Sequence, residues 1–239
     1  AGPAGLFAAR ELSKKKKVLL IDAGVDLQDK ECKIETIGQC RYCKPTCHII
    51  GGFGGAQFFE GTKLSIYPAG TGLTNFLDDE MNIQDLYKSV DEILEKYGKS
   101  PRPIPALKDI NELKEEFQKQ GIEMKYYNSQ KVSKYTMNKI CYNLKEELSL
   151  NAVTIQLREQ IHDIVKNADG TFLLKTKNTQ YIASKIIFAV GRIGSRQLTK
   201  LADKLEIKYE DEEQEMEIGV RIEMPYHVFN KVNNIHNDL

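Results

Sequence analysis

The 239 residues, 41% of them hydrophobic, are enough to bury one large core or two smaller interleaved ones. Thirty-four basic and 34 acidic residues cancel, so the composition offers no electrostatic case for binding nucleic acid or an anionic membrane. No apolar stretch approaches the roughly 18 residues that a membrane helix needs, and no secretory signal is visible, so we expect a soluble, cytoplasmic protein without a membrane partner.

The first residues have the pattern of a glycine-rich dinucleotide loop that leads into a helix. This predicted loop consists of Gly2, Pro3, Ala4 and Gly5. Residues 18–21 (Val-Leu-Leu-Ile) then predict a short strand ending at Asp22, about 20 residues beyond the glycines, where such folds bind ribose. We expect Gly2 to let the backbone approach a pyrophosphate and Gly5 to let the helix pack closely on the sheet. We expect the Asp22 carboxylate to accept hydrogen bonds from the ribose hydroxyls.

We expect the chain to begin inside this motif, because neither the first strand nor the first glycine of a dinucleotide fold precedes Gly2. A plainer interpretation is a helix that begins Gly-Pro-Ala-Gly by chance, followed by a buried strand and a turn aspartate. Helix, strand and acid at the expected spacing together favour the cofactor interpretation.

Four cysteines fall within sixteen residues: Cys32, Cys40, Cys43 and Cys47. Four thiols in so short a loop could bind zinc tetrahedrally or hold an iron–sulfur cluster, although the spacing matches no standard zinc finger. Alternatively, the thiols exchange electrons with a cofactor, pair as a disulfide, or are inert. The fifth cysteine, Cys141, lies in a predicted helix, and we expect it to pack in the core of the protein.

The middle of the chain predicts a loop-rich segment followed by helices. Residues 51–72 are rich in glycine and lack periodicity, which indicates a lid or bridge over a cofactor. The predicted helices span residues 82–97, 110–120 and 135–148. Glycines at 98 and 121 stop the first two. Prolines make residues 100–105 an extended connector, and residues 122–127 predict a strand.

A strand-rich block comes next. The predicted strands cover residues 153–157, 161–165 and 172–176. Asp169 and Gly170, between the last two strands, indicate a hairpin. Residues 186–190 predict a buried strand that returns to the parallel sheet and stops at Gly191 and Arg192, where we favour cofactor contact over a plain loop.

Five pieces of the chain carry a further pattern. They are residues 2–9 with 18–22, residues 51–56 (Gly-Gly-Phe-Gly-Gly-Ala), residues 90–98, residues 187–192, and residues 218–223 (Ile-Gly-Val-Arg-Ile-Glu). In this order they resemble a family of FAD-dependent dehydrogenases, which are flavoproteins with two dinucleotide-binding folds. Members of that family are longer, so this chain looks like an N-terminal portion of one.

The resemblance implies an α/β fold: a Rossmann-like, FAD-binding parallel sheet with a β-meander insertion and a discontinuous second α+β domain. Element order suggests an FAD-binding domain of residues 1–75 and 135–203, and a substrate or cap domain of residues 76–134 and 204–239. The resemblance also implies that backbone around Ile161 contacts adenine. The candidate cofactor-binding residues are Gly2, Pro3, Ala4, Gly5, Asp22, Gly54, Gly55, Ile161, Ala189, Gly191 and Arg192.

We therefore expect an FAD-dependent oxidoreductase that acts on an unknown organic substrate, with NAD(P)H or a protein electron carrier as a further partner. The flavin carries the hydride or electron chemistry, so no catalytic side chain need be named. Asp22 suits NAD as well, but the Pro-Ala-Gly-Leu continuation and the hairpin favour flavin.

Two alternatives stay open. After residues 51–56 the family usually continues Gly-x-Phe-Ser-Asp-Gly-Lys-Leu, whereas this chain has Gln-Phe-Phe-Glu-Gly-Thr-Lys-Leu. That departure motivates a non-catalytic flavin- or nucleotide-binding module. The cysteine cluster motivates a metal-binding or redox adaptor.

Overall fold

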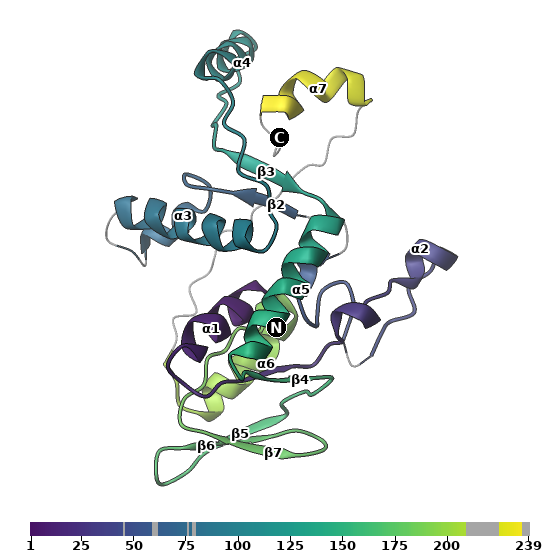
Figure 1. Ribbon diagram of the computed structural model, residues 1–239, viewed down its shortest axis with the longest axis vertical. Coiled ribbons are helices and arrows are strands. Elements are labelled where there is room, and N and C mark those ends of the chain that lie inside the picture. Colours follow the sequence, from purple (N-terminus) through teal and green to yellow (C-terminus); the bar gives the residue numbers. More distant parts are fainter. Residues whose placement is uncertain (45, 59–61, 76, 78–79, 209–224, 236–239) are drawn as a thin grey trace. The chain divides into compact units, whose positions relative to one another are not determined.

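The computed structural model describes residues 1–44, 46–58, 62–75, 77, 80–208 and 225–235 (Figure 1). It divides into two compact units, Ala1–Phe59 with Cys141–Gln214 and Glu60–Ile140 with Glu215–Leu239. Each unit is discontinuous in sequence, and the chain is mixed α/β with a small parallel sheet. None of the helices in the described ranges is long and apolar enough to cross a membrane. Residues 218–223, part of the resemblance above, lie outside these ranges.

The first unit begins with a helix that leads into a parallel pair of strands. Its elements are α1 (Pro3–Ser13), β1 (Leu19–Asp22), η1 (Leu27–Asp29), α2 (Lys33–Ile37), η2 (Gly55–Phe58), β4 (Thr154–Leu157), β5 (Asp163–Lys166), β6 (Phe172–Lys175), β7 (Gln180–Ala183) and α6 (Gly191–Lys204). β1 pairs with β4 in parallel, from Leu19 opposite Thr154 to Asp22 opposite Leu157. The predicted N-terminal helix and strand are confirmed.

A long helix, α5 (Lys134–Leu150), precedes β4 and continues across the boundary between the units. Its buried side chains recur at helical spacing: Met137, Ile140, Cys141, Leu144 and Leu148. Burial of one apolar stripe explains why the predicted helix over residues 135–148 forms. Cys141 is 4% exposed, which confirms its predicted place in a core.

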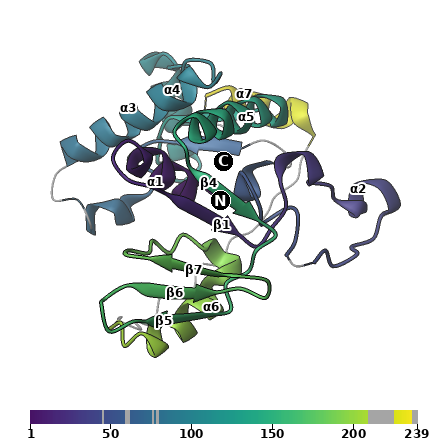
Figure 2. The same cartoon turned by 60° about the horizontal axis from the view of Figure 1, so that its bottom comes forward.

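The strands β5, β6 and β7 form the predicted antiparallel meander (Figure 2). Asn167 to Gly170 make the turn between β5 and β6, and Gly170 has a φ of +83°, which glycine tolerates best. Ile164 and Leu174 face each other across these strands and pack with Leu201 of α6. The sequence analysis does not predict α6, because it takes Gly191 only as the residue at which a strand ends.

The predicted strand over residues 186–190 is wrong. This stretch pairs with neither β1 nor β4, and it is not buried throughout, since Ile187 is 60% exposed. An apolar run specifies burial only where a neighbouring strand accepts its hydrogen bonds, and no described strand does so here. The run instead leads into α6, whose N-cap residue is Val190.

The second unit is built around an antiparallel pair of strands and two amphipathic helices. Its elements are β2 (Thr62–Ser65), η3 (Thr71–Asn75), α3 (Glu80–Lys96), α4 (Leu107–Lys119), β3 (Ser129–Val132) and α7 (Tyr226–Ile235). β2 pairs with β3 from Thr62 opposite Val132 to Ser65 opposite Ser129. The predictions of α3, α4 and the intervening connector are confirmed.

The strand predicted over residues 122–127 is also wrong. The alternation of Ile122, Met124 and Tyr126 suggests a strand, but Ile122 is 52% exposed and hydrogen bonding with the β2 segment starts only at Asn128. The pairing partner, a strand of the loop-rich segment 51–72 that was not predicted, decides where β3 begins.

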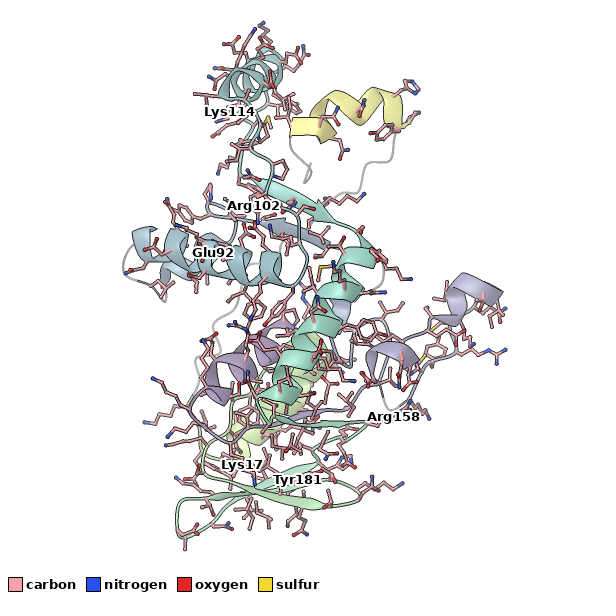
Figure 3. All side chains as sticks on the ribbon, viewed as in Figure 1. Lys17, Glu92, Arg102, Lys114, Arg158 and Tyr181 are labelled. Carbon is pink, nitrogen blue, oxygen red and sulfur yellow. The ribbon has the colours of Figure 1, made fainter. Side chains whose placement is uncertain are left out.

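A buried ionic network joins α3 to the connector and β3 in this unit. The Lys99 ammonium is fully buried and lies 3.1 Å from Glu95 Oε1, 3.7 Å from Asp91 Oδ1 and 3.0 Å from Gln130 Oε1. Arg102, labelled in Figure 3, binds both oxygens of Asp91 at 2.8 and 2.9 Å. Every charge is matched by a counter-charge or a carbonyl, as a buried network requires.

Candidate functional site

The start of α1 offers backbone donors to a ligand. Gly2 is its N-cap residue, with extended backbone, and Pro3 occupies the first helical turn. The first hydrogen bond of the helix runs from Leu6 N to Gly2 O (2.9 Å), so the amides of Ala4 and Gly5 have no acceptor within the helix. Pro3 and Ala4 are exposed. Gly5 is buried, so this helix end presents the Ala4 amide and the positive end of a helix dipole to solvent.

Gly5 lies where α1 meets β1 and the segment before α6. A Cβ placed on Gly5 would lie 3.5 Å from Ala189 Cβ and 3.7 Å from Leu20 Cδ1. Such distances are ordinary contacts for one methyl group and leave no room for a larger side chain. The close approach of helix to strand is the role expected of Gly5, and it brings Ala189, a predicted site residue, to the same place.

A second glycine turn, residues 52–55, lies directly against the first. Its glycines at 52, 54 and 55 have φ values of +85°, +83° and +61°, and the Phe53 side chain between them is fully buried. Gly54 N donates to Ala1 O (2.9 Å), and Phe53 N donates to Val25 O (3.0 Å). A Cβ on Gly55 would lie 3.0 Å from Gly2 Cα, so any other residue there would push the two turns apart by a few tenths of an ångström.

The Asp22 carboxylate joins the two turns. Its Oδ1 accepts hydrogen bonds from Gly24 N (2.7 Å) and Gly52 N (3.0 Å), and its Oδ2 lies 2.5 Å from the Ala1 amino nitrogen. Burial raises the pKa of Asp22. The Ala1 amino group and the two amides lower it by a larger amount, so the net shift of the pKa is downward. The two amides therefore occupy Oδ1 within the chain.

The carboxyl ends of the parallel strands meet beside Asp22. β1 ends at Asp22 and β4 at Leu157, and the next residues hydrogen-bond across: Arg158 N to Gly24 O (2.8 Å) and Glu159 N to Asp22 O (3.1 Å). Arg158, labelled in Figure 3, has a φ of +59° and an exposed guanidinium 3.1 Å from Asp29 Oδ2. Open parallel sheets bind ligands at this edge, where the two glycine turns also lie.

Lys30 belongs to the same cluster and was missed by the sequence analysis. Its Nζ donates to Gly55 O at 2.7 Å. Burial lowers the pKa of Lys30 to about 8, although Cys141, Asp22 and Cys47 act to raise it. Nothing in the local sequence distinguishes Lys30 from other surface lysines, because residues far away in the chain bury it.

Three predicted site residues lie elsewhere in the first unit. The carbonyl of Ile161 accepts a hydrogen bond from Gln197 of α6, and the Ile161 side chain packs beside the meander core. Gly191 and Arg192 form the exposed first turn of α6. Their predicted cofactor contacts stay predictions.

The four clustered cysteines are not gathered into a metal site. Cys40 is exposed and Cys32, Cys43 and Cys47 are partly exposed, and all are free thiols. In the described ranges no three His, Cys, Asp or Glu side chains are grouped so that they could hold a metal ion. The backbone around Cys47 forms a turn that leads into Gly51, whose N donates to Cys47 O (2.8 Å). The zinc and iron–sulfur interpretations therefore gain no geometric support.

No protein-family model matches the chain, and no curated protein matches it.

Proposed function

We propose that this chain binds FAD through its two glycine turns and serves an FAD-dependent oxidoreductase. The diphosphate of the cofactor lies against the start of α1, at the exposed Ala4 amide. The ribose lies beside Asp22, at the carboxyl ends of β1 and β4. FAD supplies the hydride or electron chemistry, and the substrate is an organic molecule of unknown kind.

The single observation that carries the proposal is the contact between the two turns. Gly55 lies against Gly2, Gly5 packs on Leu20 and Ala189, and Asp22 binds the Gly52 amide of the second turn. A Cβ at Gly55 would crowd the Gly2 backbone, and a side chain larger than alanine at Gly5 would crowd Leu20 and Ala189. A Rossmann-like site needs this arrangement: a glycine cradle, a helix start free to receive phosphate, and an acid at the next strand end.

The hydrogen bonds of Asp22 refine the proposal. Since both amides bind Oδ1, a ribose hydroxyl would bind Oδ2. The proposal therefore assigns Asp22 two tasks, which are to bind ribose and to hold the second glycine turn.

A single substitution at the exposed helix start tests where the cofactor binds. Ala4→Asp adds a carboxylate in the first turn of α1, where the helix dipole favours negative charge and where a diphosphate would be repelled. Ala4→Asn is the neutral control of the same shape. We expect the wild-type protein to bind FAD, the Asn variant to bind it similarly, and the Asp variant to bind it at least about tenfold more weakly.

The measurements are FAD titration by calorimetry, the visible flavin spectrum after purification, and thermal unfolding without ligand. The Asp variant should unfold at the same temperature as the Asn variant or higher, which separates lost binding from lost folding. Wild-type protein that binds no FAD would contradict the proposal, and equal binding by both variants would show that the ligand lies elsewhere. Reduction of bound flavin by NAD(P)H or another donor then distinguishes an oxidoreductase from a non-catalytic flavin module.

A further inference from the structure

Lys30 stands out because the fold places a cation where burial opposes its charge. The ammonium donates to Gly55 O at 2.7 Å, and its neighbours from three other segments are Asp22 of β1, Cys47 of the cysteine loop and Cys141 of α5. Burial outweighs these neighbours and lowers the pKa of Lys30 to about 8. A neutral side chain of the same length would avoid that desolvation but would leave Gly55 O without this donor.

The position of the ammonium is tied to the first glycine turn through Gly55. The carbonyl oxygen of Gly55 binds Lys30, while the Cα side of the same residue rests against Gly2 and Pro3. The Cα and O atoms of one residue are only two bonds apart. The partly buried Lys30 ammonium and the positive end of α1 therefore flank one residue and add their fields at the same place.

We infer that Lys30 is a positioning residue for a diphosphate ligand: its ammonium holds the Gly55 carbonyl, and thereby the second glycine turn, against the start of α1, and supplies positive charge to the bound phosphates. This inference rests on the proposed function and extends it by naming the residue that compensates the ligand's charge. Anionic ligands are bound most strongly where a charged donor adds to backbone amides, which is the arrangement at Gly55.

The test compares Lys30→Met, Lys30→Arg and Lys33→Met with the wild-type full chain. Methionine keeps the apolar stem without the charge, and arginine keeps the charge. Lys33 is the matched control, because its ammonium is 42% exposed and pairs with Glu31 at 2.5 Å on the surface. FAD affinity is measured by calorimetry, and the unfolding temperature is measured without ligand.

We expect Lys30→Met to weaken FAD binding by about tenfold to a hundredfold, the range for one lost charged hydrogen bond. Its unfolding temperature should change little, because the substitution relieves the burial cost of the charge but also removes the donor to Gly55 O. Lys30→Arg should recover most of the affinity, and Lys33→Met should behave like the wild type.

Three results would overturn the inference, and each is distinguishable. If wild-type protein binds no FAD, the proposed function and the inference fail together. If the wild type binds FAD and Lys30→Met binds it equally well, the inference alone fails. If Lys30→Met loses affinity together with a marked fall in unfolding temperature, and arginine does not restore binding, Lys30 has a structural role only.

Discussion

Replacing Gly52 by alanine tests the packing of the second glycine turn on the segment that follows β1. At a φ of +85°, an L-residue pays about 1–2 kcal/mol relative to glycine. The added Cβ would also lie 2.3 Å from Val25 O and 2.8 Å from Val25 N. Both are backbone atoms that cannot rotate away, so overlap adds about 1–3 kcal/mol. We expect the free energy of unfolding to fall by about 2–5 kcal/mol in total.

Gly170→Ala is the control that isolates the overlap. Gly170 has nearly the same φ, +83°, but a Cβ there meets nothing within 4 Å. Both glycines belong to the first unit. Urea unfolding followed by circular dichroism should therefore give a loss of about 1–2 kcal/mol for Gly170→Ala and a clearly larger one for Gly52→Ala. Equal losses for the two variants would refute the close contact between Gly52 and Val25.

Three further predictions concern charge and thiol chemistry. Asp22→Asn should destabilise the protein by about 2–3 kcal/mol at pH 7, because a charged acceptor of buried amides is lost. Folding lowers the pKa of Asp22 from its ordinary 3.8, so this contribution is present at neutral pH and is lost as the pH falls below about 4. Iodoacetamide followed by mass spectrometry should label exposed Cys40 but not Cys141 at pH 8, because burial raises the pKa of the Cys141 thiol to about 11. Asp91→Asn should cost about 3–5 kcal/mol, since it removes the charge that Arg102 binds through both oxygens and that lies 3.7 Å from the Lys99 ammonium.

Each of these predictions has a control within the chain. For Asp91, the matched substitution is Glu112→Gln, whose partner Lys108 lies 3.7 Å away and 82% exposed, and it should cost less than about 1 kcal/mol. For Cys141, labelling should appear once the protein is unfolded in urea. For Asp22, the difference in stability between wild type and variant should shrink with acid; a constant difference from pH 7 to pH 3 would contradict the depressed pKa.

The sequence by itself determined the elements whose signals are local. Pro3 at a helix start, the apolar stripe of α5 and the Asp-Gly turn of the meander each specify a backbone conformation through close neighbours in the chain. The sequence also determines the spacing between Gly5 and Asp22, since one short helix and one short strand connect the two residues. Whether that pair binds FAD is still a prediction.

Tertiary structure decided everything that depends on a distant partner. Residues 122–127 and 186–190 have strand-like sequences, but a strand exists only where another strand accepts its hydrogen bonds, and β3 forms opposite β2 instead. Folding also binds Oδ1 of Asp22 to two backbone amides and partly buries Lys30 beside Gly55. Pairing and desolvation are set by residues tens of positions away, so periodicity and spacing do not encode them.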